Sequence, residues 1–430
     1  MKVAETTLEN GLRIVTASLA DAHSVTVNIV VGTGSRFEEF TKNGGVSHFL
    51  EHLLFKGSQK YPSAQIIAET VDAVGGYNNA YTTEDVTSYY IKVPARHLDL
   101  ALDILADMVK TPLLDAEEID RERGVIIEEM NVFRDDPSRQ IGMLVPSLIF
   151  PNNPLGGDIL GTEEVIKSIP RAAIAGYLGE RYRPNNLVVA VAGAVDHEEA
   201  VAKIRASLGD MTSGELATFK PVADGLDRDL VVAHAKPTAQ AHFMVAARGY
   251  AYEDADEPTA RLVAAILGRG MSSRLFLNVR ERQGLAYSVF AETNSFVDTG
   301  LFEAYAGVNL DKIQQALDSV LHELEVIRHE EPAAAELDKA KQQLIAGLEM
   351  SLESNSNIAD RIGTQLVLLG RVRTIEDSIA RIEAVKAADI RRVAAAMLDP
   401  QRLRFAIIAP EPDPVAAHFV EYLGKFKEKS

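Results

Sequence analysis

The strongest constraint on the fold is an order of strand and helix signals that occurs twice along the 430-residue chain. In each half, an apolar strand-like run is followed by helical segments, two further strand-like runs, several helices and a late apolar strand. The first series begins at "SVTVNIVVG" and closes at "NLVVAVAG", and the second begins at "QAHFMVAARG" and closes at "RLRFAIIAP". The period of about 215 residues is too long for a solenoid and indicates a duplicated domain.

The two copies are separated by residues 209–228, where Gly, Pro, Ser and Asp mix without helical or strand periodicity. Such a composition is typical of an exposed linker. We therefore predict an N-terminal domain over 1–208, a linker over 209–228 and a homologous C-terminal domain over 229–430. The mixture of strand and helix signals predicts an α+β fold, in which each copy is an antiparallel sheet with helices packed on one face.

Composition restricts the classes of function. The chain carries 62 acidic and 44 basic residues, a net charge of −18, so we expect no nucleic-acid partner, which would require a basic surface. The same charge favours neutral or basic peptides. Cysteine is absent, so only histidine and carboxylate side chains could hold a metal ion. No apolar stretch is long enough to predict a membrane span, and no targeting segment is recognisable, so we expect a cytoplasmic protein.

The stretch "NGGVSHFLEHLLFKG" (43–57) places three titratable residues, His48, Glu51 and His52, inside an apolar run. Burying such groups without partners costs of order several kcal/mol. On a helix, His48 and His52 share a face, so their imidazoles can converge on one metal ion, while Glu51 lies offset and can reach a water molecule. This order, H-x-x-E-H, is that of the inverted zincins. The alternative, two surface histidines beside a salt-bridging glutamate, fits poorly with the apolar neighbours.

A third ligand is needed, because a catalytic zinc usually has three protein ligands and one open position. The segment 115–133, "DAEEIDRERGVIIEEMNVF", predicts a long helix rich in acidic residues. Glu122 and Glu129 are two turns apart on one face of this helix, and Glu128 points elsewhere. Spacing alone leaves open a second interpretation, a solvated acidic helix without a ligand.

These residues resemble the pitrilysin/insulinase-type zinc peptidases, and among them the short members similar to mitochondrial processing peptidase. In that family the zinc site is completed by a glutamate that follows the second histidine after 76 intervening residues, and 76 residues separate His52 from Glu129 here. The resemblance implies His48, His52 and Glu129 as metal ligands and Glu122 as the outer residue that orients them. It extends over nearly the whole chain and rests on "GGVSHFLEHLLFKG", "NNAYTTEDVTSYY", "ERGVIIEEM", "YRPNNLVVAVAG" and "RERQGLAYSV".

Two further elements are implied by the resemblance alone. Asn79, Ala80 and Tyr81 match the family's edge strand, to which an extended substrate adds as one more strand; an ordinary strand is an equally good interpretation of this segment by itself. Arg280 and Tyr287 match an Arg/Tyr pair that faces the scissile carbonyl, where both side chains can donate to an oxyanion. Without the resemblance, Tyr287 would be interpreted as a core aromatic residue.

The resemblance implies a zinc-dependent metalloendopeptidase that hydrolyses peptides or small unfolded proteins through a zinc-activated water, with Glu51 as general base. Two alternatives are a catalytically silent structural relative and one half of an obligate heterodimer. Because this chain carries both the H-x-x-E-H set and the Arg/Tyr pair, we expect an active enzyme that forms a homodimer.

The residues that follow the third ligand differ from those in one branch of the family, and this difference bears on substrate choice. Presequence-processing relatives have acidic residues shortly after the third ligand, where they select arginine near the cleavage site. Here the corresponding residues are Ser138, Arg139 and Gln140. We therefore expect general peptide hydrolysis rather than arginine-directed cleavage of presequences.

Overall fold

The computed structural model describes residues 1–223 and 230–427, which form two compact units. The units do not follow the midpoint of the sequence, because each half of the chain contributes one segment to the unit built mainly from the other half. Unit 1 consists of Met1–Met130, Gly157–Lys220 and Glu349–Arg373, and unit 2 contains Asn131–Gly156, Pro221–Leu348 and the described residues from Thr374 onward.

The domain boundaries expected from the sequence stay a prediction about the two homologous copies. Within the expected linker, residues 211–223 form neither helix nor strand, and residues 224–228 lie outside the described residues. Residue 229 and residues 428–430, which belong to the expected C-terminal domain, also lie outside them.

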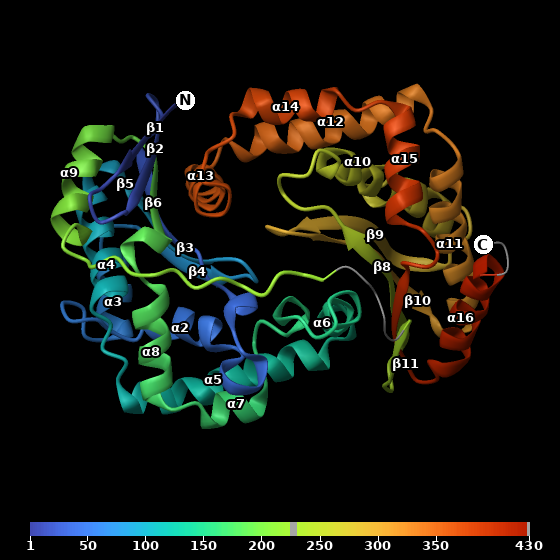
Figure 1. Cartoon of the computed structure of the whole chain (residues 1–430), viewed down its shortest axis with the longest axis horizontal. Coiled ribbons are helices and arrows are strands. Elements are labelled where there is room, and N and C mark those ends of the chain that lie inside the picture. Colours follow the sequence, from blue (N-terminus) through green and yellow to red (C-terminus); the bar gives the residue numbers. More distant parts are fainter. Residues whose placement is uncertain (224–229, 428–430) are drawn as a thin grey trace. The chain divides into compact units, whose positions relative to one another are not determined.

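Unit 1 is organised around a six-stranded sheet (Figure 1) with the order β1-β2-β6-β3-β5-β4. All neighbouring strands are antiparallel except β2 and β6, which run parallel. Among the described strands, β4 pairs with β5 alone and lies at the edge of the sheet, as expected for the segment around Asn79. The strands are β1 (Lys2–Thr7), β2 (Arg13–Ser18), β3 (Ser24–Val31), β4 (Tyr77–Thr82), β5 (Thr87–Pro94) and β6 (Leu187–Gly193).

Helices cover both faces of this sheet. Along β2, Thr16 hydrogen-bonds to His197 at the start of α9, whereas its neighbour Val15 packs against α13 on the opposite face. A strand buried on both faces needs apolar residues throughout, which explains the fully buried run of β6. The helices of this unit are α1 (Phe40–Asn43), α2 (Val46–Leu54), α3 (Ala64–Asp72), α4 (Leu98–Lys110), α5 (Ala116–Asp135, of which residues 116–130 belong here), α7 (Glu163–Ser168), α8 (Arg171–Arg181), α9 (His197–Leu208) and α13 (Asn355–Leu369).

Unit 2 repeats the arrangement with a five-stranded sheet of order β7-β11-β8-β10-β9, in which β7 and β11 are the parallel pair. Here α6 packs on β8 and β11, through a cluster that includes Ile141 and Val145, as α13 packs on β2 and β6 in unit 1. The strands are β7 (Val231–Ala235), β8 (Gln240–Gly249), β9 (Ala286–Ser295), β10 (Gly300–Asn309) and β11 (Arg404–Ala409). The helices are α6 (Pro137–Ile149), α10 (Glu257–Gly268), α11 (Ile313–His329), α12 (Ala334–Ser351, of which residues 334–348 belong here), α14 (Ile375–Glu383), α15 (Ala387–Met397) and α16 (Asp413–Lys427).

The predicted α+β fold with a duplicated sheet-and-helix unit is confirmed, with two differences in detail. Each sheet contains one parallel pair, and a single helix from the other half of the sequence covers its second face. An apolar stripe on a helix shows that the helix must pack, but not which sheet receives it. Among the described residues, no helix combines the length and the apolar character needed to cross a membrane.

The contact between α13 and the first sheet predicts a position where added volume is harmful. A Cβ atom on Gly363 would lie 2.8 Å from Cγ2 of Val30 and 3.0 Å from Cβ of Ala190. Gly363→Leu should lower the free energy of unfolding by about 1–3 kcal/mol because the strand side chains cannot move away. Gly176→Leu on α8, where a Cβ meets nothing within 4 Å, is the matched control. Equal stability of the two variants in urea denaturation would contradict the described packing.

Candidate metal centre

The start of helix α2, which carries the H-x-x-E-H residues, is fixed by the conformation of Gly45 and by hydrogen bonds to Glu38. Gly45 precedes it with φ of +88°, and a Cβ atom there would lie 2.4 Å from the carbonyl oxygen of Leu160. The buried carboxylate of Glu38 accepts the backbone N–H groups of Gly45 and Ser47 at 2.6 and 2.8 Å, which satisfies two donors of the helix N-terminus. Burial nevertheless raises the pKa of Glu38 to about 8. These contacts set the position from which the histidines project.

The two histidines lie one turn apart on the same face of α2, as the sequence predicts. Their ring centroids are 4.6 Å apart. Glu129 of α5 reaches both: its Oε2 lies 3.6 Å from Nε2 of His48 and 3.5 Å from Nε2 of His52. One potential ligand atom from each of the three residues lies within 4.8 Å of the other two. Glu128 is exposed and is not part of this group.

Glu122 lies behind His52, where it orients the imidazole. Its Oε2 accepts a hydrogen bond from Nδ1 of His52 at 3.0 Å, and its Oε1 accepts one from Nζ of Lys56 at 2.6 Å. Because the proton of the neutral imidazole is thereby kept on Nδ1, the lone pair of Nε2 is directed toward Glu129 and His48. Glu122 was predicted from the sequence, but Lys56 was not, although it follows His52 by four residues.

The pKa values of the two imidazoles shift in opposite directions. Burial, together with the nearby His52, lowers the pKa of His48 to about 4. Burial also acts to lower the pKa of His52, but the hydrogen bonds to Glu122 and Glu129 outweigh it and raise the pKa to about 9. His48 is therefore held neutral, whereas His52 has to release its Nε2 proton when it binds a metal ion.

The donor set fits a zinc ion. Ligand atoms about 2.0–2.1 Å from a tetrahedral zinc are about 3.3–3.4 Å apart, and the Glu129 oxygen lies 3.5 and 3.6 Å from the two imidazole nitrogens. Two imidazoles and one carboxylate also make one of the three-ligand sets found in zinc peptidases. The Nδ1 atom of His48 is buried and has no hydrogen-bond partner in the part of the chain that the structure describes.

Glu51 lies beside this group and is positioned by the edge strand. Its Oε2 accepts a hydrogen bond from Oγ1 of Thr82, the last residue of β4, at 2.6 Å. Burial raises the pKa of Glu51. The sequence analysis did not single out Thr82, because the contact depends on the packing of β4 against α2, although the residue lies inside the quoted motif "NNAYTTEDVTSYY".

The predicted substrate-binding residues lie on the same strand. Asn79, Ala80 and Tyr81 belong to β4, and the Asn79 side chain accepts the backbone N–H of Ala80 at 2.9 Å. The Tyr81 hydroxyl donates to Asp360 of α13. The helix contributed by the second half of the chain therefore anchors the strand that holds Glu51, a link that sequence spacing could not show.

The structure also brings the predicted Arg/Tyr pair together. Arg280 lies in η5 (Phe276–Glu281), a π-helical turn, and its Nη1 donates to the carbonyl oxygen of Tyr287 at 2.6 Å. The guanidinium lies 5.3 Å from the centroid of the Tyr287 ring, and that residue is 74% exposed. Tyr287 is therefore a surface aromatic residue rather than a core one.

Comparison with known proteins places this geometry in a family. A family model described as Insulinase (Peptidase family M16) matches residues 13–163, and one described as Peptidase M16 inactive domain matches residues 168–344. The chain is 36% identical over 421 residues to an uncharacterized zinc protease of Streptomyces coelicolor, covering 96% of this chain and 91% of the relative. It belongs to the insulinase (M16) peptidase family.

Other relatives extend the comparison. An uncharacterized zinc protease of Bacillus subtilis is 33% identical over 410 residues, covering 94% of this chain and 97% of the relative. A probable mitochondrial-processing peptidase subunit beta of Arabidopsis thaliana is 31% identical over 427 residues, covering 95% and 78%. The crystal structure of a protease from Helicobacter pylori shares the fold with a TM-score of 0.88 and 23% identity, covering 95% of this chain and 99% of that one.

Adjacent glutamates on α5 allow a matched test of the metal centre. Glu129→Gln should weaken zinc binding by about 100-fold or more, because the substitution removes a charged ligand. Glu128→Gln makes the same change one residue earlier, on an exposed side chain, and should bind zinc like the unaltered chain. Zinc content measured by elemental analysis after dialysis checks this. Equal zinc in the two variants would show that Glu129 is not a ligand.

Proposed function

We propose that this peptidase is a zinc-dependent endopeptidase that hydrolyses peptides or small unfolded proteins. The observation that carries the proposal is the convergence of His48, His52 and Glu129 with the Glu51 carboxylate beside them. The names of the bacterial relatives, zinc proteases, support the choice of metal. A catalytically silent relative would have no reason to keep all four side chains in this arrangement.

Each residue of the site has a separate role in the proposed reaction. Zinc, when bound by His48, His52 and Glu129, supplies Lewis acidity, which polarises a carbonyl oxygen and makes water acidic enough to act as a nucleophile near neutral pH. Glu51 then accepts the proton that the attacking water loses and can return it to the leaving amine. Thr82 occupies one oxygen of Glu51 and leaves the other free for this transfer.

The edge strand suggests how a peptide is held. β4 pairs on one side only with β5, so an extended substrate can add to its other side through backbone hydrogen bonds around Asn79, Ala80 and Tyr81. Such bonds do not depend on the substrate's side chains, and they need an extended segment, which an unfolded peptide offers readily. The net charge of −18 favours basic or neutral peptides.

The direct test of the proposed function is Glu51→Gln. A carboxamide cannot accept the proton, so kcat for a fluorogenic peptide should fall by at least about 10²–10⁴-fold while zinc content stays unchanged. The zinc measurement separates loss of the base from loss of the metal. Appreciable hydrolysis by the metal-loaded variant would overturn the role of Glu51, and hydrolysis by a fully zinc-free chain would overturn the proposed function.

Thr82 should act as a positioning residue. Thr82→Val removes the hydroxyl and keeps the shape, so the Glu51 carboxylate loses its anchor, and we expect kcat to fall about 10- to 100-fold with little change in KM. Thr82→Ser keeps the hydroxyl and should retain most of the activity. A purely structural role would affect both variants alike, so equal kcat values for the serine and valine variants would count against the assignment.

We further propose that the chain acts as a homodimer in which Arg280 and Tyr287 of one protomer serve the metal centre of its partner. The resemblance stated above supports this arrangement, and so does the exposure of the Tyr287 ring, which leaves its hydroxyl available to a carbonyl oxygen outside unit 2. A guanidinium and a phenol are both suited to stabilise an oxyanion.

Complementation tests the arrangement. Tyr287→Phe alone should lower kcat by about 10²–10³-fold, and Glu51→Gln alone should be inactive. A mixed dimer of the two variants contains one site with both side chains intact, so activity should recover to as much as half that of the unaltered dimer. Isolated mixed dimers without recovery would show that the pair does not act across protomers.

A further inference from the structure

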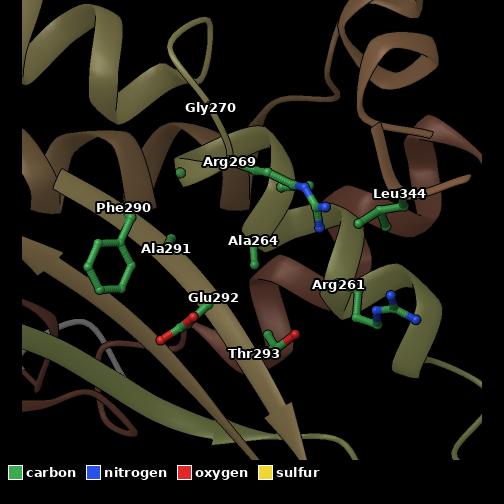
Figure 2. A pocket seen from close by; sticks show the side chains of 11 residues that line it. Arg261, Ala264, Arg269, Gly270, Phe290, Ala291, Glu292, Thr293 and Leu344 are labelled. Atoms are coloured by element: carbon green, nitrogen blue, oxygen red, sulfur yellow. The ribbon is translucent and has the colours of Figure 1, made fainter. Parts of the chain in front are cut away.

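Unit 2 contains a cavity of about 440 Å³ between α10, β9 and α12 (Figure 2). Its lining includes two arginines, Arg261 and Arg269, together with Ala264, Thr293 and Leu344. In Figure 2 the guanidinium of Arg269 points into the space between Leu344 and Ala264. Nothing in the proposed peptidase mechanism uses this cavity.

Because the two units are duplicated copies, the residues at this cavity can be aligned with those of the metal centre in unit 1. The stretch "HFLEHLLFKG" (48–57) in α2 and beyond matches "RLVAAILGRG" (261–270) in α10 and beyond. Helices α2 and α10 both end shortly before a glycine with positive φ. The φ angle is +142° at Gly57 and +80° at Gly270. The aligned pairs are His48 with Arg261, Glu51 with Ala264, and His52 with Ala265.

The other elements of the metal centre have counterparts at the same cavity. The stretch "DRERGVIIEEM" (120–130) of α5 matches "DKAKQQLIAGL" (338–348) of α12. The hairpins also correspond, because Thr82 pairs with Thr87 across the first turn and Ser295 with Gly300 across the second. The aligned pairs are Glu122 with Ala340, Ile126 with Leu344, Glu129 with Gly347, and Ala80 with Thr293.

The cavity is therefore the metal centre of the second copy after every ligand has been replaced. Alanines at 264 and 265 line the cavity where the first copy has Glu51 and His52, and arginines at 261 and 269 stand at the positions of His48 and Lys56. A Cβ atom on Gly347 would lie 2.9 Å from Nη2 of Arg269, so the guanidinium occupies the room that a side chain at this position would need. The Arg269 guanidinium therefore lies beside the position that corresponds to Glu129.

The arginines of the cavity lack strong partners. In the described part of the chain, the Arg269 side chain makes no ion pair or hydrogen bond, and Arg261 has Glu257 at 3.7 Å, beyond hydrogen-bond distance. Glu292 also lines the cavity, but no ion pair joins it to either arginine among the described residues. In a chain of net charge −18, two such guanidinium groups at one cavity are a site for an anion.

We propose that this cavity binds a carboxylate group, supplied either by the C-terminus of a peptide or by a small free carboxylic acid. A guanidinium offers two parallel N–H groups that match the two oxygens of a carboxylate, and the Thr293 hydroxyl adds a further donor. The single charge of a carboxylate also suits a cavity where Glu292 opposes a second negative charge. The peptide source rests on the proposed function, because each peptide-bond hydrolysis releases a new C-terminal carboxylate.

Binding is measured by calorimetry on the full-length Glu51→Gln chain, which prevents cleavage during the titration. The probes are a short Ala/Ser peptide with a free C-terminus, the same peptide as its C-terminal amide, and propionate. The free-acid peptide should bind at least tenfold more tightly than the amide, because amidation removes a charge-assisted hydrogen-bonding pair. Propionate binding as tightly as the peptide would assign the site to small acids, and much weaker binding would assign it to peptide C-termini.

A second substitution locates the binding. Arg269→Gln, added to Glu51→Gln, should remove the preference for the free acid, whereas Arg391→Gln on the exposed face of α15 should not. Thermal unfolding of both variants verifies that they are folded. A preference that survives Arg269→Gln, or equal binding of acid and amide to the parent chain, would overturn the proposal. Because binding is read without turnover, this result is independent of whether the unaltered chain hydrolyses peptides.

Discussion

The arrangement of the site depends on one requirement. The imidazoles on the apolar helix α2 need polar or charged partners inside the protein. Helix α5 meets it with Glu129, which faces both rings, and with Glu122, which accepts a hydrogen bond from His52. Lys56 in turn balances the charge of Glu122. Because Glu129 and Glu122 face the two imidazoles, the helix can be buried and still present nitrogen lone pairs to one point.

The residues that sequence reasoning could place are those related by helical periodicity. His48 and His52 share a face at a spacing of four, and Glu122 and Glu129 share one at a spacing of seven. Periodicity alone did not show that the acidic helix supplies a ligand, and Glu129 was assigned by the resemblance to zinc peptidases. Contacts between distant elements could not be placed in this way. The hydrogen bond from Thr82 to Glu51 needs the packing of β4 against α2, which no local pattern contains.

The fold shows the same limit. Alternating and continuous apolar runs located the strands, but strand direction depends on how the chain returns, so the parallel pairs β2–β6 and β7–β11 were missed. The exchange of helices α6 and α13 between the two sheets was not predicted, because an apolar helix face does not show which sheet receives it. Their exchange has a consequence for the site, since Asp360 on α13 holds Tyr81 of the edge strand. The duplication itself was visible, and it also relates the metal centre to the arginine-lined cavity of unit 2.

The central claim is that His48, His52 and Glu129 hold a catalytic zinc. The most direct measurement is X-ray diffraction from crystals of the unaltered chain, collected on both sides of the zinc absorption edge. The account predicts one strong anomalous peak per chain, within about 2.0–2.2 Å of one atom from each of the three side chains and within reach of the Glu51 carboxylate. An active, crystallised protein with its zinc at another position, or with no zinc peak at all, would contradict it.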